Sequence, residues 1–267
     1  MLRDITLGQY YQTDSVIHRL DPRVKLAGTL LYIISLFFFK NFIAYLIAIV
    51  FLATVIKLSH VPFRFMVKGM KAIVFLLLIT VVFNLFLTPG EALVTCWKLT
   101  ITKEGVEMAV TMAVRLTMLI IGSSIMTLTT TPNNLTDGME KGLRPLKLFH
   151  VPVHEVAMMM SIALRFIPIL MEETDKIMKA QIARGADFES GNLIRRARAM
   201  VPLLVPLFIS AFRRANDLAM AMEARCYRGG DGRTKMKPLI YQKRDRIAYL
   251  CILLYLVVSI GVGRILL

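Results

Sequence analysis

Two stretches of the chain end in the same way, with an arginine between an alanine and a small residue. The two triplets are Ala183-Arg184-Gly185 and, 41 residues further on, Ala224-Arg225-Cys226. A guanidinium group presents several N–H donors in a fixed plane, which suits two parallel hydrogen bonds to one carboxylate. The repeated pattern therefore favours two separate helix ends, each of which binds an acidic group on another molecule.

The same residues also have a purely structural interpretation. An arginine in the last turn of a helix complements the negative end of the helix dipole. Gly185 suits the position at which a helix ends. Either arginine taken alone is explained as a helix cap, and it is the repetition of the pattern that favours binding.

Catalytic chemistry finds little support in the sequence. The chain lacks a GxxxxGK[ST] phosphate loop, so ATP hydrolysis has to be supplied by another protein. The three cysteines, Cys96, Cys226 and Cys251, form neither a CxxC motif nor a disulfide framework. We expect no catalytic residue, no bound metal and no cofactor in this chain.

The composition is that of an integral membrane protein. Hydrophobic residues make up 56% of the 267 residues and charged residues 19%, against roughly 45–50% and 25% in soluble domains. The mean hydropathy is +0.62. The N-terminal 25 residues are charged and lack an apolar core followed by a cleavage site, so they do not resemble a signal peptide.

We predict an all-α membrane protein with about five spanning helices and a cytoplasmic domain of about three helices. Asp21-Pro22 predicts the start of the first span, with Asp as N-cap and Pro at the first helical position. One helix over 24–58 would be about 52 Å long, too long for a hydrocarbon core of about 30 Å, so we divide it at Lys40-Asn41. The predicted domains are residues 1–131, with spans at about 24–39, 41–58, 72–88 and 106–130, then 132–246, and a last span at 247–267.

The charge distribution predicts the orientation. The chain has 33 Lys and Arg against 18 Asp and Glu, which gives +15. On the predicted topology 28 basic residues lie on the inner side, four on the outer side and Arg115 inside the fourth span. Because cytoplasmic segments are rich in Lys and Arg, the N-terminus and residues 132–246 are expected in the cytoplasm and the C-terminus outside.

Residues 132–246 contain two long amphipathic helices, preceded by a shorter one at about 133–148. Apolar or small residues recur at steps of three and four. In the two helices they are Val156, Met159, Met160, Ala163, Ile167, Leu170, Thr174 and Ile177, and Val201, Leu204, Val205, Phe208, Phe212, Ala215, Ala219 and Met222. Arg165, Pro168 and Glu172 make burial of the first helix in lipid costly, so both helices are expected beneath the membrane. Partial or full insertion of the first helix is the alternative.

Further residues accompany the triplets in a fixed order. They are His18-Arg19-Leu20-Asp21-Pro22-Arg23-x-Lys25, then Arg165-x-x-Pro168, Glu172 and Gln181 before the first triplet, and Arg214 and Glu223 before the second. With these motifs the chain resembles the transmembrane (T) component of energy-coupling factor (ECF) transporters, prokaryotic importers of vitamins and metal ions. The family often has Gly or Ser where Cys226 stands, which leaves the form of that turn open.

The resemblance implies a non-catalytic subunit of an ABC-type transporter in the prokaryotic cell membrane. Family members bind two cytoplasmic ATP-binding-cassette ATPases, which hold ATP and Mg, and a membrane-embedded S component that captures the substrate. On this basis Arg184 and Arg225 would each enter a groove of one ATPase. Closure of the ATPases would drive the two helices relative to each other and reorient the S component. The substrate and the identity of the ATPases stay open.

Other residues are assigned supporting roles. Arg115, a charge inside a span, is expected to pair with a neighbouring helix or to contact the S component. Met159 and Met160 belong either to an adaptable surface for several S components or to ordinary core packing. Asp21, Pro22 and Arg23 start a helix and are candidates to brace the cytoplasmic insert.

Two other function classes are the alternatives. The first is an intramembrane enzyme that acts on a lipid-linked phosphate through Arg115 and the basic insert. The second is an oligomeric channel. Nucleic-acid binding is disfavoured because acidic residues alternate with the basic ones of the insert and no aromatic stacking platform accompanies them.

Overall fold

The computed structural model describes residues 10–39, 41–96, 99–188, 192–230, 236 and 238–265. Residue 40, at the predicted break between the first two spans, and residues 266–267 of the last predicted span lie outside the described residues. The chain divides into two compact units. We call Gly8–Met139 with Leu239–Leu267 the bundle unit, and Glu140–Pro238 the paired-helix unit.

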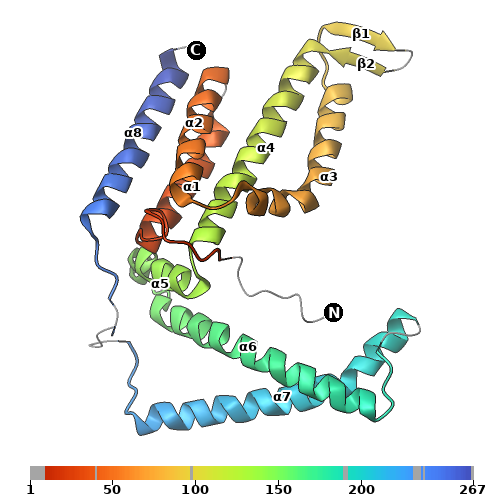
Figure 1. The fold of residues 1–267 in the computed structure, drawn as a ribbon, viewed down its shortest axis with the longest axis vertical. Helices are drawn as coiled ribbons and strands as arrows, with labels where there is room; N and C mark the ends of the chain where they lie inside the picture. Colours follow the sequence, from red (N-terminus) through yellow and green to blue (C-terminus); the bar gives the residue numbers. More distant parts are fainter. Residues whose placement is uncertain are drawn as a thin grey trace. The chain divides into compact units, whose positions relative to one another are not determined.

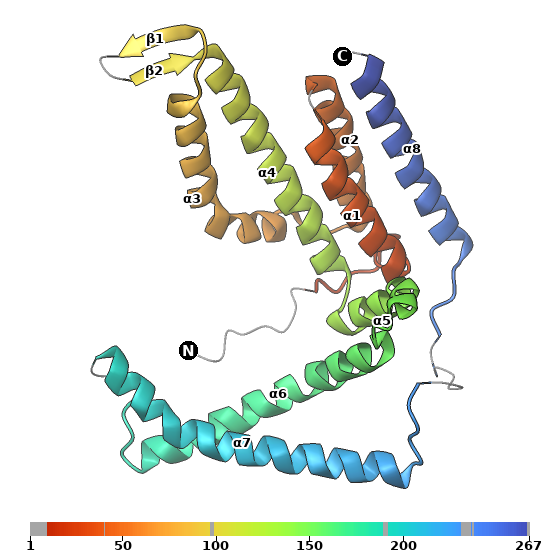
Figure 2. The same cartoon turned by 180° about the vertical axis from the view of Figure 1, so that it is seen from behind.

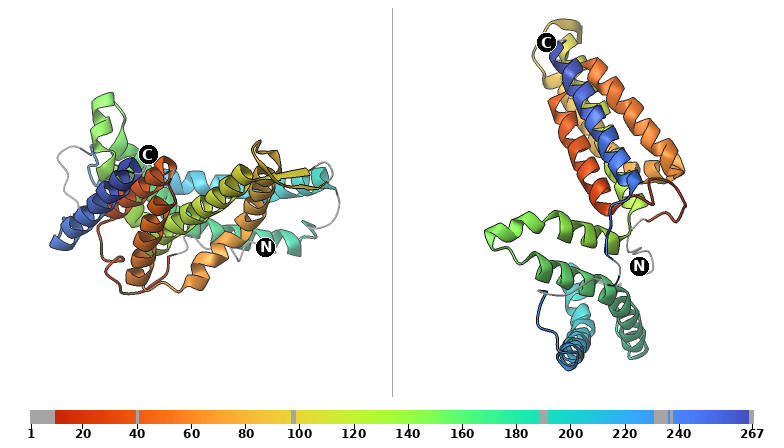
Figure 3. Two further views of the ribbon diagram at one scale, coloured as in Figure 1. Left: turned by 90° about the horizontal axis from the view of Figure 1, so that it is seen from above. Right: turned by 90° about the vertical axis from the view of Figure 1, so that its left-hand side faces the viewer.

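Long helices build the bundle unit. They are α1 (Pro22–Phe38), α2 (Phe42–Ser59), α3 (Phe63–Leu87), α4 (Lys103–Thr129) and α8 (Lys243–Ile265). The helix α8 contacts both α1 and α2, and α4 contacts α1, α2 and α3 (Figures 1, 2 and 3). The third helix begins nine residues before the predicted span, because the apolar run alone does not mark its basic first turns.

The beginning of α1 follows the prediction. Asp21 is the N-cap, its side chain accepts a hydrogen bond from the Arg23 backbone N–H at 2.9 Å, and Pro22 occupies the first helical position. The core of the bundle lies where α1, α2, α4 and α8 meet. Small residues allow this close approach: a Cβ at Gly122 of α4 would come within 2.7 Å of the Tyr32 ring of α1.

A short hairpin joins α3 to α4. Its strands are β1 (Ala92–Cys96) and β2 (Leu99–Thr102), and they pair antiparallel. Thr102 is also the N-cap of α4, and its hydroxyl donates a 2.9 Å hydrogen bond to the Thr88 carbonyl at the end of α3. The hairpin was not expected from the sequence, and it closes the end of the α3–α4 pair.

The paired-helix unit contains α6 (Val153–Ala183) and α7 (Leu193–Ala224). The single helix predicted at 133–148 was wrong, because α5 (Pro132–Gly142) ends before the 3₁₀ helix η2 (Arg144–Phe149). Pro145 explains the interruption, since proline lacks an N–H and restricts the residue before it. The helices α6 and α7 run antiparallel and cross, with their C-terminal ends at opposite ends of the pair (Figures 1 and 2).

Among the described residues, four helices are long and apolar enough to cross a membrane. They are α2, α4, α6 and α8. With 17 residues α1 is shorter, and α3 contains a shorter apolar stretch, Ile73–Phe86. The inclusion of α6 is compatible with the alternative in which this helix inserts into the membrane.

Candidate functional site: two arginine-capped helix ends

The first arginine sits at the C-cap of α6. Gly185 follows it in the left-handed region, at φ +87°, and its N–H donates to the Ile182 carbonyl at 2.9 Å. The Ala186 N–H reaches back to the Gln181 carbonyl at 3.0 Å. These two hydrogen bonds define a Schellman motif, which satisfies carbonyls that the end of a helix otherwise leaves unpaired.

The second arginine sits at the C-cap of α7 in the same geometry. Cys226 takes the place of glycine at φ +54° and donates its N–H to the Glu223 carbonyl at 2.8 Å. The Tyr227 N–H donates to the Met222 carbonyl at 3.0 Å. The turn left open by the cysteine therefore has the form of the first one.

Both arginines are exposed, and so are the flanking Ala183, Gly185, Ala224 and Cys226. Within the described part of the chain, neither guanidinium forms an ion pair. Both C-cap residues have nearly the same backbone conformation, with φ −88° and ψ 6° at Arg184 and φ −92° and ψ 11° at Arg225. Each cap therefore holds its arginine at the tip of a rigid helix with the side chain available to a partner.

The antiparallel pairing separates the two arginines. Gln181, three residues before Arg184, contacts Pro202 of α7. From Pro202 the helix α7 continues for 23 residues to Arg225, which corresponds to roughly 34 Å at 1.5 Å per residue. One groove of ordinary size therefore does not accommodate both tips.

One ion pair links the two helices at equivalent positions. Arg214 Nη2 of α7 lies 2.7 Å from Glu173 Oε2 of α6, and both side chains are about one third exposed. Each of these residues lies 11 positions before the arginine at the tip of its own helix. Eleven residues make about three helical turns, so the ion pair and the tip lie on the same side of each helix.

A second contact between the helices supplies a hydrogen bond that the backbone of α7 lacks. The carbonyl of Pro202 faces the position of Pro206, which has no N–H to donate in the helical ladder. Gln181 Nε2 of α6 donates to this carbonyl at 3.3 Å. The glutamine beside the first tip thus couples the end of α6 to the proline-containing segment of α7.

The remaining predicted residues of the two helices point outward. Met159, Met160, Arg165, Pro168, Glu172 and Glu223 are exposed. The apolar stripe of α7 is also uncovered, with exposed fractions of 51% at Val201, 63% at Phe208 and 66% at Phe212. A face this apolar is typical of contact with another protein or with lipid.

Arg115 is held inside the bundle unit by an aromatic neighbour. Its Nε donates a 2.9 Å hydrogen bond to the Tyr45 hydroxyl of α2, and its guanidinium carbon lies 5.9 Å from the centres of the Tyr45 and Phe37 rings. These contacts link α4 to α2 and α1.

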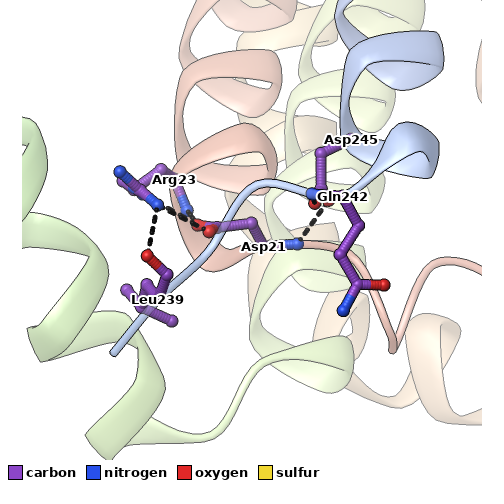
Figure 4. A network of polar contacts seen from close by, with 5 residues as sticks. All are labelled: Asp21, Arg23, Leu239, Gln242 and Asp245. Carbon is purple, nitrogen blue, oxygen red and sulfur yellow. Dashed lines mark hydrogen bonds and ion pairs between the residues drawn. The ribbon is translucent and has the colours of Figure 1, made fainter. Parts of the chain in front are cut away.

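A polar clamp joins the start of α1 to the start of α8. The buried Asp245 carboxylate accepts hydrogen bonds from the backbone N–H groups of Asp21, at 2.9 Å, and Gln242, at 2.7 Å (Figure 4). Arg23 pairs with Asp21 through two side-chain bonds and donates to the Leu239 carbonyl at 3.3 Å. Its guanidinium also stacks over the Tyr241 ring at 3.9 Å. Asp21 and Arg23 therefore hold the segment Leu239–Gln242 that leads into the last helix.

Comparison with known proteins decides the family. The sequence model of the CbiQ family, described as cobalt transport protein, matches residues 13–236. The chain is 58% identical over 262 residues to the energy-coupling factor transporter transmembrane protein EcfT of Clostridium kluyveri, covering 97% of each chain. The chain belongs to the ECF transmembrane-protein family. The EcfT proteins of Thermosediminibacter oceani, 53% identical over 93% of this chain and 94% of the relative, and of Bacillus subtilis, 46% identical over 92% and 93%, extend the match.

Membership in the ECF transmembrane-protein family makes the chain a transporter component located in a membrane. Several residues of the site were not identified from the sequence: Glu173, Pro202, Pro206, Tyr241 and Asp245.

The sequence did contain a signal for the Glu173–Arg214 ion pair. When the two arginine triplets are aligned with each other, Glu172-Glu173 aligns with Arg213-Arg214. Pro22 also has a packing role, since a Cβ at Gly138 of α5 would come within 2.9 Å of the Pro22 Cβ.

Proposed function

We propose that this chain transmits the closure of two cytoplasmic ATPases to a membrane-embedded, substrate-binding S component of an ECF-type importer of a vitamin or metal ion. Arg184 and Arg225 each bind an acidic groove of one ATPase, which holds ATP and Mg. The observation that carries the proposal is the pair of equivalent Schellman ends, each with an exposed arginine at the C-cap. The separation of the two tips favours two ATPases over one.

The exposed stripe of α7 is the part of the pair that we assign to the S component. Phe208 and Phe212 stack on each other with ring centres 6.4 Å apart, so they form a continuous apolar surface. When the tips are displaced, this surface moves with α7 and reorients the S component. Met159 and Met160, exposed on α6 where Met158 contacts Tyr227 near the second tip, are assigned to the same partner.

We also propose that the tips lie in the cytoplasm. The end of the bundle unit where α1 and α8 begin carries Arg19, Arg23, Lys25 and Arg244, whereas Lys103 of α4 and Arg264 of α8 lie toward the opposite end. The excess of positive charge on one end supports a cytoplasmic N-terminus and an external C-terminus. Fusion of alkaline phosphatase after residue 267 is expected to be active, and fusion of green fluorescent protein at the same point is expected to be dark. The opposite result would reverse the orientation.

Co-purification of the tagged chain with its candidate ATPases tests the coupling role. Arg184→Glu and Arg225→Glu are each expected to lower ATPase recovery, and the double variant is expected to abolish it. Arg213→Glu, which makes the same charge change at an exposed position of α7, is the matched control and retains both ATPases. Each variant is first checked for a monodisperse elution profile in detergent.

The outcomes separate binding from capping. If the folded double variant retains both ATPases, the arginines serve only as helix caps and the proposal is wrong. Phe208→Asn is expected to reduce recovery of the S component while ATPase recovery is unchanged. Equal recovery of the S component with this variant would remove α7 from that contact.

A further inference from the structure

The bundle unit contains a large apolar cavity that the coupling role does not use. Its volume is about 560 Å³, within the range of about 300–1,000 Å³ that is usual for ligand sites. Residues from α1, α2, α4 and α8 line it, including Val24, Leu52, Gly122 and Ile252. Such a cavity among closely packed helices suits an elongated apolar ligand better than a polar one.

The rim of the cavity opens between helices that suit a membrane. Val50 on α2 and Ile247 and Leu254 on α8 line the cavity and are 60%, 63% and 61% exposed. Both α2 and α8 are apolar and long enough to span the hydrocarbon core. The opening would therefore face lipid acyl chains, which selects a lipid over a water-soluble ligand.

One end of the cavity is positively charged. Lys25 and Arg244 line it where α1 and α8 begin. Lys25 Nζ donates to two neutral carbonyls, of His18 at 3.1 Å and of Thr129 at 2.8 Å, so its charge is not neutralised by these bonds. Arg244 Nε is buried and has no hydrogen-bond partner among the described residues.

The two carboxylates near this end, Asp21 and Asp245, attract the Lys25 ammonium, but their hydrogen bonds go to other groups. Asp21 pairs with Arg23, and Asp245 accepts two backbone N–H groups. Three cations, Arg23, Lys25 and Arg244, therefore stand against two anions, and Arg244 supplies the excess. Burial of an arginine donor without a partner is costly, so the site lacks one hydrogen-bond acceptor among the described residues, and the positive charge there favours an anionic one. The Tyr32 hydroxyl, also on the cavity wall, is a second buried group without a partner among the described residues.

We propose that this cavity binds one anionic phospholipid. One acyl chain lies between α1, α2 and α8, and the phosphate accepts hydrogen bonds from Arg244 and charge from Lys25. The inference does not depend on the coupling function. It assigns to Arg244 a ligand that a membrane supplies and that the described residues do not provide.

Lipid binding to the full-length chain in detergent tests the proposal. Native mass spectrometry compares phosphatidylglycerol with phosphatidylcholine of the same acyl chains, since only the former carries net negative charge. We expect about tenfold tighter binding of phosphatidylglycerol, because both lipids offer a phosphate acceptor but the positively charged choline of phosphatidylcholine is repelled by Arg244 and Lys25. Arg244→Gln removes this preference and Arg244→Lys retains most of it. Arg246→Gln, an exposed neighbour that does not line the cavity, is the matched control and leaves the preference unchanged.

Two further measurements locate the bound molecule. Ala248→Phe fills the cavity and is expected to weaken binding of both lipids, whereas millimolar inorganic phosphate is expected not to displace the lipid. Equal binding of the two lipids, or full binding to the Ala248→Phe variant, would overturn the proposal. Cross-linking of Cys251 on the cavity wall to the S component in the assembled transporter would also overturn it, because a protein would then occupy the site.

Discussion

At the scale of single residues, the two tips differ at one position of their caps. Gly185 and Cys226 occupy the same left-handed position, but a side chain in this region costs roughly 1–2 kcal/mol, and glycine avoids this cost. The cysteine keeps the turn, which shows that the remaining hydrogen bonds of the motif outweigh the strain. The second tip is therefore held less firmly than the first.

One substitution at each cap measures this difference in stability between the two helix ends. Cys226→Gly is expected to stabilise the end of α7 by ~1 kcal/mol, because the backbone strain is removed. Gly185→Ala is expected to destabilise the end of α6 by about the same amount, since a Cβ there meets no other atom and only the backbone is strained. Hydrogen exchange of the Tyr227 and Ala186 amides reports each end separately. Unchanged exchange in both variants would contradict the assigned strain.

His18 gives the protein a dependence on pH. Its Nε2–H donates to the Tyr11 carbonyl at 3.0 Å, and Nδ1 accepts from the Ser15 hydroxyl at 2.7 Å, which suits the neutral ring. Burial lowers the pKa of His18 below 6.5, and the positive charge of Lys25 lowers it further. The hydrogen bond to the Tyr11 carbonyl raises this pKa but does not outweigh burial. Below pH 6.5 the unfolded chain therefore binds more protons than the folded chain.

The expected result is a loss of stability on acidification. The contribution of His18 is complete above pH 6.5 and falls as the pH drops from that value toward the lower pKa of the folded state. Thermal unfolding in detergent, measured between pH 8 and 5.5, is expected to fall more steeply for the wild type than for His18→Gln. Parallel curves would show that the pKa of His18 is the same in the folded and the unfolded chain.

At the scale of elements, α6 and α7 depend on each other. The prolines of α7 leave the Pro202 carbonyl without a helical donor, and Gln181 of α6 supplies one. The Arg214–Glu173 ion pair adds a second link, worth about 0.5–1 kcal/mol at its partial exposure. The pair is thus joined near the first tip and again at equivalent positions along both helices.

A double-mutant cycle tests the role of Gln181. Gln181→Ala alone is expected to cost about 0.5–1 kcal/mol, because the Pro202 carbonyl loses its donor. In a Pro206→Ala background the new backbone N–H serves this carbonyl, so the same substitution is expected to cost almost nothing. Pro168→Ala, which supplies an N–H to the Leu164 carbonyl on the other helix, is the control background and leaves the cost unchanged. Additive costs in the Pro206→Ala background would refute the assignment.

The sequence predicted these elements unevenly. Stripes of apolar residues and the two arginine triplets located α6 and α7 and their C-terminal ends, because periodicity and capping are local properties, but the predicted stripe of α7 began at Val201 and the helix begins at Leu193. The hairpin was not predicted because β1 and β2 have only five and four residues. Over so few positions, the alternation of apolar and polar residues does not distinguish a strand from a loop. The Glu173–Arg214 pair was missed because charge alone does not tell which faces of two helices meet.

At the scale of the whole molecule, the polar clamp connects residues far apart in the chain. Asp21 and Asp245 are separated by 224 positions, yet the carboxylate of one binds the backbone of the other. Asp245 is 1% exposed, so its two hydrogen bonds are shielded from water. The clamp therefore fixes where the chain returns to the bundle unit after the paired helices.

Loss of the polar clamp is expected to loosen the start of α1 and the segment before α8 together. Asp245→Asn replaces one acceptor with an amide donor that faces a backbone N–H, which is expected to cost about 1.5–3 kcal/mol. Hydrogen exchange is expected to accelerate at the Asp21 and Gln242 amides alike. Arg246→Gln, at the next and exposed position, is the control. Acceleration at only one of the two amides would contradict a shared clamp.

The equal spacing of each tip from the ion pair has a mechanical consequence. Each arginine ends an arm of 11 residues, or about 16 Å of helix, measured from Glu173 or Arg214. The arms point in opposite directions because the helices are antiparallel (Figure 2). Opposed forces of equal size on two such arms make a pure torque, which turns the pair about the ion pair without displacing it. A partner resting on the pair would then be tilted and not lifted.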